Sequence, residues 1–195
     1  MIAKGLDFPK VTLVGVISAD TGLYLPDFRA TERTFQLLTQ VAGRAGRKGG
    51  QGEVIIQTYS DRHYCLQCTK KHDFKQFFYN ELADRHTLNY PPFGRLALLQ
   101  MKHKDEKKAW QAALHLASLL KAMDKTYEIL GPAPAPLAKL QQYYRFQIIL
   151  KNNRKHDPAA KRMRAAIKKA VETYRKESRH GAVSLTIDID PMAIL

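Results

Sequence analysis

Residues 11–17 read Val-Thr-Leu-Val-Gly-Val-Ile, and residues 53–58 read Glu-Val-Ile-Ile-Gln-Thr. Short apolar runs rich in β-branched residues are typical of buried parallel strands. A helix is expected between them over residues 30–45, with Thr31 placed to cap its start. The apolar residues on one face of this helix are Phe35, Leu38, Val41, Ala42 and Ala45. The order strand, helix, strand predicts an α/β unit in which helices cover a parallel sheet.

A domain boundary is expected after a helical linker. Residues 61–88 favour helix, whereas the run Tyr90-Pro91-Pro92-Phe93-Gly94 cannot continue one. We therefore predict a first segment over residues 1–60, a linker over 61–90 and a second domain over 91–195.

The second domain is predicted to have the order β-α-β-β-α-β. Its four expected strands are residues 95–101, 127–130, 143–150 and 183–189. The Pro-rich run 131–136 is expected in a loop or at a sheet edge, because proline has no N–H for a strand ladder. This order predicts a small α+β domain that is ferredoxin-like.

Two amphipathic helices complete this domain. The predicted buried face of the first consists of Trp110, Ala113, Leu114, Ala117 and Leu120. Asp157 is expected to cap the second helix, with Pro158 in its first position. The predicted inward residues of the second helix are Met163, Ile167, Ala170 and Tyr174.

Positive charge is concentrated in the second domain. The chain of 195 residues has 32 Lys and Arg against 18 Asp and Glu. Residues 91–195 hold twenty of the former and nine of the latter, a net charge of +11. Such an excess attracts polyanions, although a merely solvated basic surface would have the same composition.

The sequence excludes a membrane-spanning protein. Its apolar runs are all shorter than the roughly eighteen residues that a span needs, and its start does not resemble a signal peptide. The expected location is the cytoplasm.

Cys65 and Cys68 form a CxxC pair. Two cysteines are too few for a disulfide framework, and a structural zinc ion needs about four ligands. His63 and His72 are near enough in sequence to complete a site, but the chain has no second cysteine pair. We expect reduced, packed thiols and no metal.

The strongest chemical motif is Gln40-Val41-Ala42-Gly43-Arg44-Ala45-Gly46-Arg47. At about 100° per residue, Gln40, Arg44 and Arg47 project within roughly 60° of one another, opposite the apolar face. Arginine meets phosphate oxygens with paired hydrogen bonds and stabilises a transferring phosphoryl group. Two arginines alone would also be typical of a solvated helix end.

This run resembles motif VI of superfamily 2 helicases, and residues 3–14 (Ala-Lys-Gly-Leu-Asp-Phe-Pro-Lys-Val-Thr-Leu-Val) resemble their motif V. The resemblance implies the end of a second RecA-like lobe that binds ATP and Mg²⁺. The residues that it places at the γ-phosphate and the cleft between lobes are Arg47 as the arginine finger, Arg44 and Gln40. Those that it places near the nucleotide, or between nucleotide and DNA, are Gly5, Asp7, Gly43 and Lys4.

Two helicase families, PriA and UvrB-like, share this form of motif V. The segments that look like PriA proteins are residues 27–33, 90–93, 130–136 and 187–191. They identify the C-terminal part of a PriA replication-restart helicase, with a UvrB-like fragment as the alternative. The resemblance implies an ATP-dependent 3′–5′ DNA helicase acting at stalled or repaired forks. It also implies a last domain that is similar to a small-subunit ribosomal protein and binds single-stranded and branched DNA. The partners that it implies are primosome and single-strand-binding proteins.

The sequence lacks a Gly-x-x-x-x-Gly-Lys-[Ser/Thr] loop, an acidic metal-binding box and the cysteine-rich zinc insertion of PriA proteins. Because ATP hydrolysis needs the P-loop lysine and a magnesium carboxylate, we expect no hydrolysis by this chain alone. The chain looks like a piece of a longer protein. A stand-alone nucleic-acid-binding module and an RNA-binding or ribosome-associated protein are the other two interpretations.

Candidate nucleic-acid contacts lie in the second domain. Strand alternation sends Tyr143 and Arg145 to one face and Tyr144 and Phe146 to the other, so one of the two pairs is expected in the core. Tyr143 and Arg145 are the candidate contacts, with the ring as a surface on which a base could stack. The basic residues of the second helix are Lys161, Arg162, Arg164, Lys168, Lys169 and Arg175, which fit either phosphate contact or solvation. Two acidic residues near the end of the chain, Asp188 and Asp190, are expected to pair with basic side chains nearby.

Overall fold

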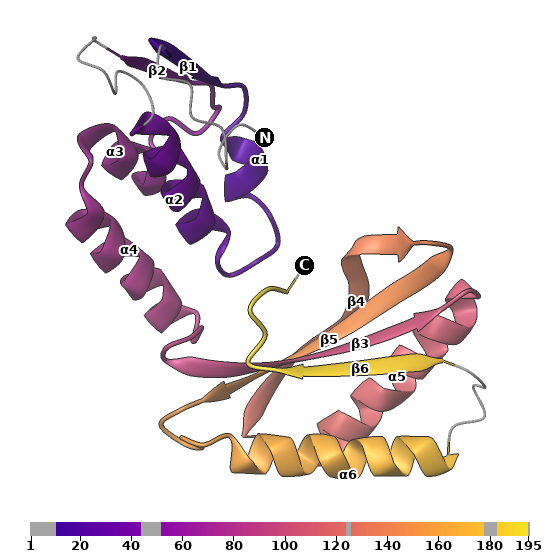
Figure 1. The fold of residues 1–195 in the computed structure, drawn as a ribbon. Coiled ribbons are helices and arrows are strands. Elements are labelled where there is room, and N and C mark those ends of the chain that lie inside the picture. Colours follow the sequence, from indigo (N-terminus) through magenta and orange to yellow (C-terminus); the bar gives the residue numbers. More distant parts are fainter. Residues whose placement is uncertain (1–10, 44–51, 124–125, 178–182, 195) are drawn as a thin grey trace. The chain divides into compact units, whose positions relative to one another are not determined.

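The structure, a computed structural model, describes residues 11–43, 52–123, 126–177 and 183–194. The chain forms two compact units, Met1–Asp84 and Arg85–Leu195, whose division falls within helix α4 (Phe74–Thr87). Within the described ranges the protein is α/β, with a small parallel sheet in the first unit and an antiparallel sheet in the second (Figure 1). The three-part functional division predicted from the sequence stays a prediction.

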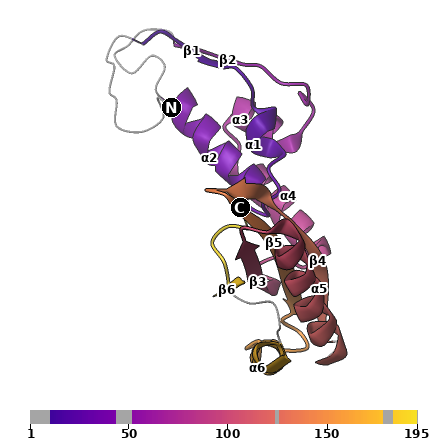
Figure 2. The same cartoon turned by 90° about the vertical axis from the view of Figure 1, so that its right-hand side faces the viewer.

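The first unit combines two strands with helices. Its elements are β1 (Leu13–Val16), α1 (Asp20–Leu23), α2 (Ala30–Ala42), β2 (Glu53–Ile56), α3 (Tyr64–Lys71) and α4. Strand β1 pairs with β2 in parallel, with Leu13 opposite Glu53. The predicted order of strand, helix and parallel strand is therefore confirmed. Helices α2 and α3 lie side by side (Figure 2).

An aromatic stack forms the centre of this first core. The ring of Phe35 stacks on Phe77 with 3.9 Å between centroids, and Leu38 is buried beside it in the same cluster. The helical segment predicted over residues 61–88 is two helices, because His72 takes a left-handed conformation (φ 52°) at the end of α3. Such a residue cannot continue a right-handed helix.

The predicted cap of α2 is wrong. Thr31 lies inside the helix, which begins at Ala30. The acidic residue just before this start is Asp27: its Oδ1 accepts a hydrogen bond from the Arg29 N–H at 2.8 Å, and its Oδ2 pairs with the Arg33 guanidinium at 3.3 Å. The carboxylate thus reaches the first turn from the preceding loop.

The described residues of the second unit form a four-stranded antiparallel sheet and two helices. Its elements are β3 (Gly94–His103), α5 (Glu106–Met123), β4 (Tyr127–Leu140), β5 (Tyr143–Asn153), α6 (Lys161–Glu177) and β6 (Ser184–Ile189). The strand order is β4-β5-β3-β6, and each neighbouring pair is antiparallel. Strand β4 is longer than the predicted residues 127–130, since it continues through the Pro-rich run. That run lies at the edge of the sheet, with register shifts on both sides of Pro134.

Helices α5 and α6 cover one face of this sheet (Figure 1). The core contains Leu99 from β3, Ile148 from β5 and Met163 from α6, all fully buried. The buried face of α5 is rotated from the predicted one, because Leu116 is 0% exposed whereas Leu114 is 44% exposed. Alanines at 109, 112, 113 and 117 share the buried face, so α5 packs closely on the sheet.

The start of α6 is held by Asp157, as predicted, although Pro158 is not the first helical residue. The Asp157 carboxylate accepts backbone N–H bonds from Lys161, Arg162 and Met163 at 2.8 to 3.2 Å. Ala160 has φ 51°, so the helix starts only after it. Among the described residues, no helix is both long and apolar enough to cross a membrane.

Candidate nucleic-acid interface

The face of the sheet opposite α5 and α6 contains a polar and cationic end. On β5, Phe146 lies in the core and Tyr144 packs against it, so strand alternation sends Tyr143 and Arg145 to the opposite face. Arg145 pairs across strands with Lys102 of β3. We call this end of the open face, made of Gln100, Lys102, Lys104, Tyr143 and Arg145, the hairpin-end surface.

Arg145 is held in position by its neighbours. Its Nε donates to Gln100 Oε1 at 3.1 Å, and its Nη1 donates to the Leu137 carbonyl at 3.4 Å. These bonds orient the planar guanidinium, which is the group best suited to paired contacts with phosphate. Gln100 is therefore a positioning residue that no motif in the sequence singles out.

Tyr143 is half-exposed and lies beside two ammonium groups. Its ring centroid is 5.8 Å from Lys102 Nζ and 5.9 Å from Lys104 Nζ, near the outer limit of cation–π contact. Alternation along β3, with Met101 buried, places Lys102 on the open face, and Lys104 follows just after the end of the strand. Period-two alternation along β3 is the signal that could have found Lys102.

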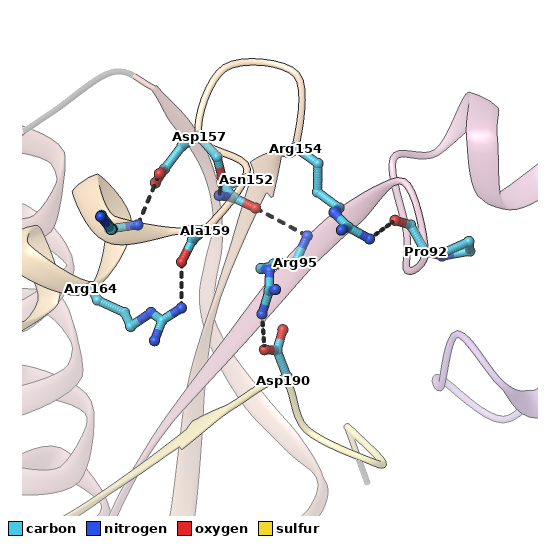
Figure 3. Close-up of polar contacts among 9 residues, drawn as sticks. Pro92, Arg95, Asn152, Arg154, Asp157, Ala159, Arg164 and Asp190 are labelled. Atoms are coloured by element: carbon cyan, nitrogen blue, oxygen red, sulfur yellow. Dashed lines mark hydrogen bonds and ion pairs between the residues drawn. The ribbon is translucent and has the colours of Figure 1, made fainter.

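The second basic surface is the outer side of α6. Lys161, Arg164 and Lys168 are all exposed there, as their sequence positions predicted. The Arg164 guanidinium donates to the Ala159 carbonyl, just before the helix (Figure 3). Beside α6 lies a groove of about 410 Å³, lined by Arg164, Ile167, Lys168, Val171, Glu172, Arg175, Ile187 and Ile189.

A polar network fixes where α6 begins (Figure 3). Asn152 Nδ2 donates to the Asp157 carbonyl at 2.9 Å, while Asn152 Oδ1 accepts the Arg95 N–H at 3.1 Å. The Arg95 guanidinium in turn pairs with Asp190 at 2.6 Å, which confirms the predicted pairing of that acid. The network connects β3, β5 and the end of β6 to the first turn of α6.

The two basic surfaces lie on opposite sides of the sheet. Tyr143 and Arg145 face away from the helices, whereas Lys161, Arg164 and Lys168 lie on one of the helices that cover the other face. The candidate contacts predicted from the sequence therefore form two surfaces and not one.

A protein family described as the primosomal protein N C-terminal domain matches residues 86–192, more than half of the chain. The chain belongs to the PriA family. This membership decides between the two helicase families that share motif V, and the UvrB-like alternative is set aside. The match covers almost the whole second unit, which is the unit that carries both basic surfaces.

The whole chain aligns with proteins that are named PriA. The chain is 46% identical to the replication restart protein PriA of Bacillus subtilis (strain 168), over 100% of this chain and 24% of that protein. The corresponding values are 42%, 100% and 22% for the PriA protein of Synechocystis sp., and 40%, 100% and 29% for that of Treponema pallidum. The chain thus spans about a quarter of the length of these relatives.

In this PriA-family chain, the run that resembles motif VI begins within helix α2. Gln40 is exposed near its end, on the side away from the buried Phe35. Gly43 is the C-cap, and a Cβ there would meet the Thr39 carbonyl at an ordinary 3.6 Å. Packing among the described residues does not require glycine at this position. The predicted contacts Lys4, Gly5, Asp7, Arg44 and Arg47 lie outside the described residues.

The cysteine pair lies on α3 and is buried in the first core. Cys65 is 0% and Cys68 4% exposed, and both thiols are free. Burial raises the pKa of Cys65 to about 12 and also raises the pKa of Cys68. His63 caps the helix, its Nδ1 accepting the Cys65 N–H at 3.2 Å. In the described part of the chain no three His, Cys, Asp or Glu side chains are grouped to hold a metal.

Proposed function

We propose that this chain is the C-terminal part of an ATP-dependent DNA helicase that acts in replication restart. Relatives that align with the full length of the chain are named replication restart proteins. The observation that carries the DNA-binding part of the proposal is the presence of two basic surfaces on the second unit. They contain the side chains that the sequence suggested as DNA contacts. The intact protein would bind single-stranded and forked DNA and act with primosome and single-strand-binding proteins.

The two units fit two known architectures. Parallel pairing of β1 with β2 beneath a motif VI helix supports the end of a RecA-like lobe. In the second unit, the element order β-α-β-β-α-β and the strand order β4-β5-β3-β6 support a ferredoxin-like domain. A stand-alone nucleic-acid-binding module is the competing interpretation, and it would need no partner lobe.

In the intact helicase, motif VI would complete an ATP and Mg²⁺ site. Arg47 would act as the arginine finger, Arg44 would contact the γ-phosphate, and Gln40 would sense the nucleotide. The exposed position of Gln40 on α2 supports this role. Gly5, Asp7 and Gly43 would lie near the nucleotide, and Lys4 would contact the DNA strand. The cysteine-rich zinc site of the family would be formed by residues outside this sequence.

The ATPase assignment is tested by Arg47→Ala in the intact helicase. We expect turnover with DNA to fall on the order of a thousandfold, because an arginine finger stabilises charge only in the transition state. Arg62→Ala, an exposed arginine of the same unit, is the matched control and should keep normal turnover. Near-normal hydrolysis by the Arg47 variant would refute the finger assignment.

DNA binding is tested with the full chain and a fluorescent oligonucleotide at several salt concentrations. Each contacting Lys or Arg that is removed should reduce the slope of log affinity against log salt by about one. We expect this for Lys161→Ala, Arg164→Ala and Lys168→Ala if α6 contacts phosphates. Lys121→Ala, at the end of α5, is the control. No binding even at low salt would refute the proposed DNA-binding role.

A further inference from the structure

The tip of the β4–β5 hairpin has a fixed geometry. Its two turn residues, Gln141 and Gln142, have φ of 48° and 67°, and Leu140 pairs with Tyr143 across the turn. A two-residue turn with both φ values positive matches the twist of the flanking strands, and it normally contains Asn or Gly. Because the paired strands hold the turn, Leu140 and Tyr143 project next to each other on one face of the hairpin.

These two side chains are exposed although both are largely apolar. Leu140 is 49% exposed and Tyr143 is 37% exposed. On the other face of the hairpin, the ring of Tyr144 packs against the buried core, and Lys139 Nζ lies 4.7 Å from its centroid. The Leu140–Tyr143 pair is therefore the part of the tip that offers a ring and an apolar neighbour to a flat ligand.

The surroundings of this pair are cationic. Lys102 and Lys104 lie beside the Tyr143 ring, and Arg145 is the next residue along β5 on the same face. The acidic residue of β6 on this face, Asp188, lies opposite Leu98, which is four residues along β3 from Lys102. A ligand at the tip that is both flat and anionic would match this combination of groups.

We propose that the Leu140–Tyr143 pair binds one unpaired base, and that Lys102 and Lys104 contact the phosphates on either side of it. The ligand class is single-stranded nucleic acid. An exposed aromatic ring can stack on a base only when the face of that base is accessible, and in a continuous duplex both faces are covered by neighbouring pairs. This inference rests on the proposed DNA-binding function and assigns the unpaired strand to the hairpin-end surface.

The experiment uses the full chain and a single-stranded oligothymidylate that contains one fluorescent adenine analogue, whose emission falls when its ring stacks. Wild type should quench the probe and bind the single strand more tightly than a duplex of the same sequence. Tyr143→Ala should abolish the quenching and weaken single-strand binding about tenfold, with an unchanged salt slope. Tyr143→Phe retains the ring and should behave as wild type.

Two controls separate stacking from charge and from folding. Tyr59→Ala removes a tyrosine of the first unit that is 94% exposed, and it should leave quenching intact. Lys102→Met and Lys104→Met should each lower the salt slope by about one. Binding without quenching, quenching that survives Tyr143→Ala, or equal affinity for duplex would overturn this inference while leaving the proposed function standing. Loss of all binding in wild type would refute both.

Discussion

At the scale of single residues, the two cysteines show how burial decides chemistry. A CxxC pair is reactive when a nearby positive charge or helix end stabilises a thiolate. Here Cys65 is fully buried, and its thiol lies 3.7 Å from the Thr31 carbonyl. Desolvation opposes the thiolate, so both side chains act as packing groups of the first core.

We predict slow alkylation of Cys65 by iodoacetamide near neutral pH in the folded chain. Its pKa is raised to about 12, so the thiol remains protonated. Its contribution to stability is complete below its ordinary pKa and is lost as the pH rises through about 12. Mass spectrometry of a Cys68→Ser variant follows this thiol alone, with denatured chain as the fast control. Equal rates in the folded and denatured chain, or stoichiometric zinc in the purified protein, would contradict this interpretation.

Asp157 is the residue with the clearest predicted cost of removal. Its carboxylate accepts three backbone N–H bonds at the start of α6. Asp157→Ala should lower the free energy of unfolding by about 1–2 kcal/mol. Asp157→Asn retains one side-chain oxygen and should recover part of this loss. A urea titration followed by the fluorescence of Trp110, the chain's one tryptophan, reports on this unit; an unchanged midpoint for the alanine variant would count against the cap.

At the scale of helices and strands, the sequence patterns predicted most elements but not their details. Short apolar runs located the β-strands, and helical periodicity located the long helices, because burial selects apolar residues at those positions. The face of α5 was misplaced, since small alanines on the buried side contribute little hydrophobicity to the pattern. The left-handed residues His72 and Ala160 also escaped prediction, because neither is a glycine or asparagine, the usual signals of positive φ.

The candidate site was likewise predicted only in part. Alternation placed Tyr143 and Arg145 on the open face, but the folded sheet brought Lys102 and Gln100 to them from β3, and Lys104 from the residue just after β3. Cross-strand neighbours are fixed by register, and register cannot be read from one strand alone. That this surface and α6 lie on opposite sides of the sheet could also be seen only from the folded structure.

Two leucines of α5 provide a direct test of its face. Leu116→Ala should lower the free energy of unfolding by about 2–5 kcal/mol, because it leaves a cavity in the core. Leu114→Ala, two positions earlier and 44% exposed, should change it by less than about 0.5 kcal/mol. The same urea titration, followed by Trp110 fluorescence, measures the free energy of unfolding of both variants. Similar costs for the two variants would mean that the helix is rotated from the position described here.

At the scale of the whole molecule, the two units differ in how much sheet they contain. The first has two described strands, whereas the second has four. A two-stranded sheet has little stability of its own, so local opening is expected to expose it more often.

Hydrogen exchange tests this difference. Amides of β1 and β2 should exchange faster than those of β3 and β5, by on the order of a hundredfold if the local opening free energies differ by about 3 kcal/mol. Amides of α5, within the larger core, serve as the slow reference. Equal protection of the two sheets would show that the first unit is as stable as the second.

The Pro-rich run of β4 has a consequence for the protein in concentrated solution. Pro132, Pro134 and Pro136 lie in an outermost strand, where each removes one amide hydrogen. A second molecule that approached this side would find few donors with which to extend the ladder, and the register shifts bend the strand away from a flat template. The prolines therefore oppose edge-to-edge aggregation through this strand.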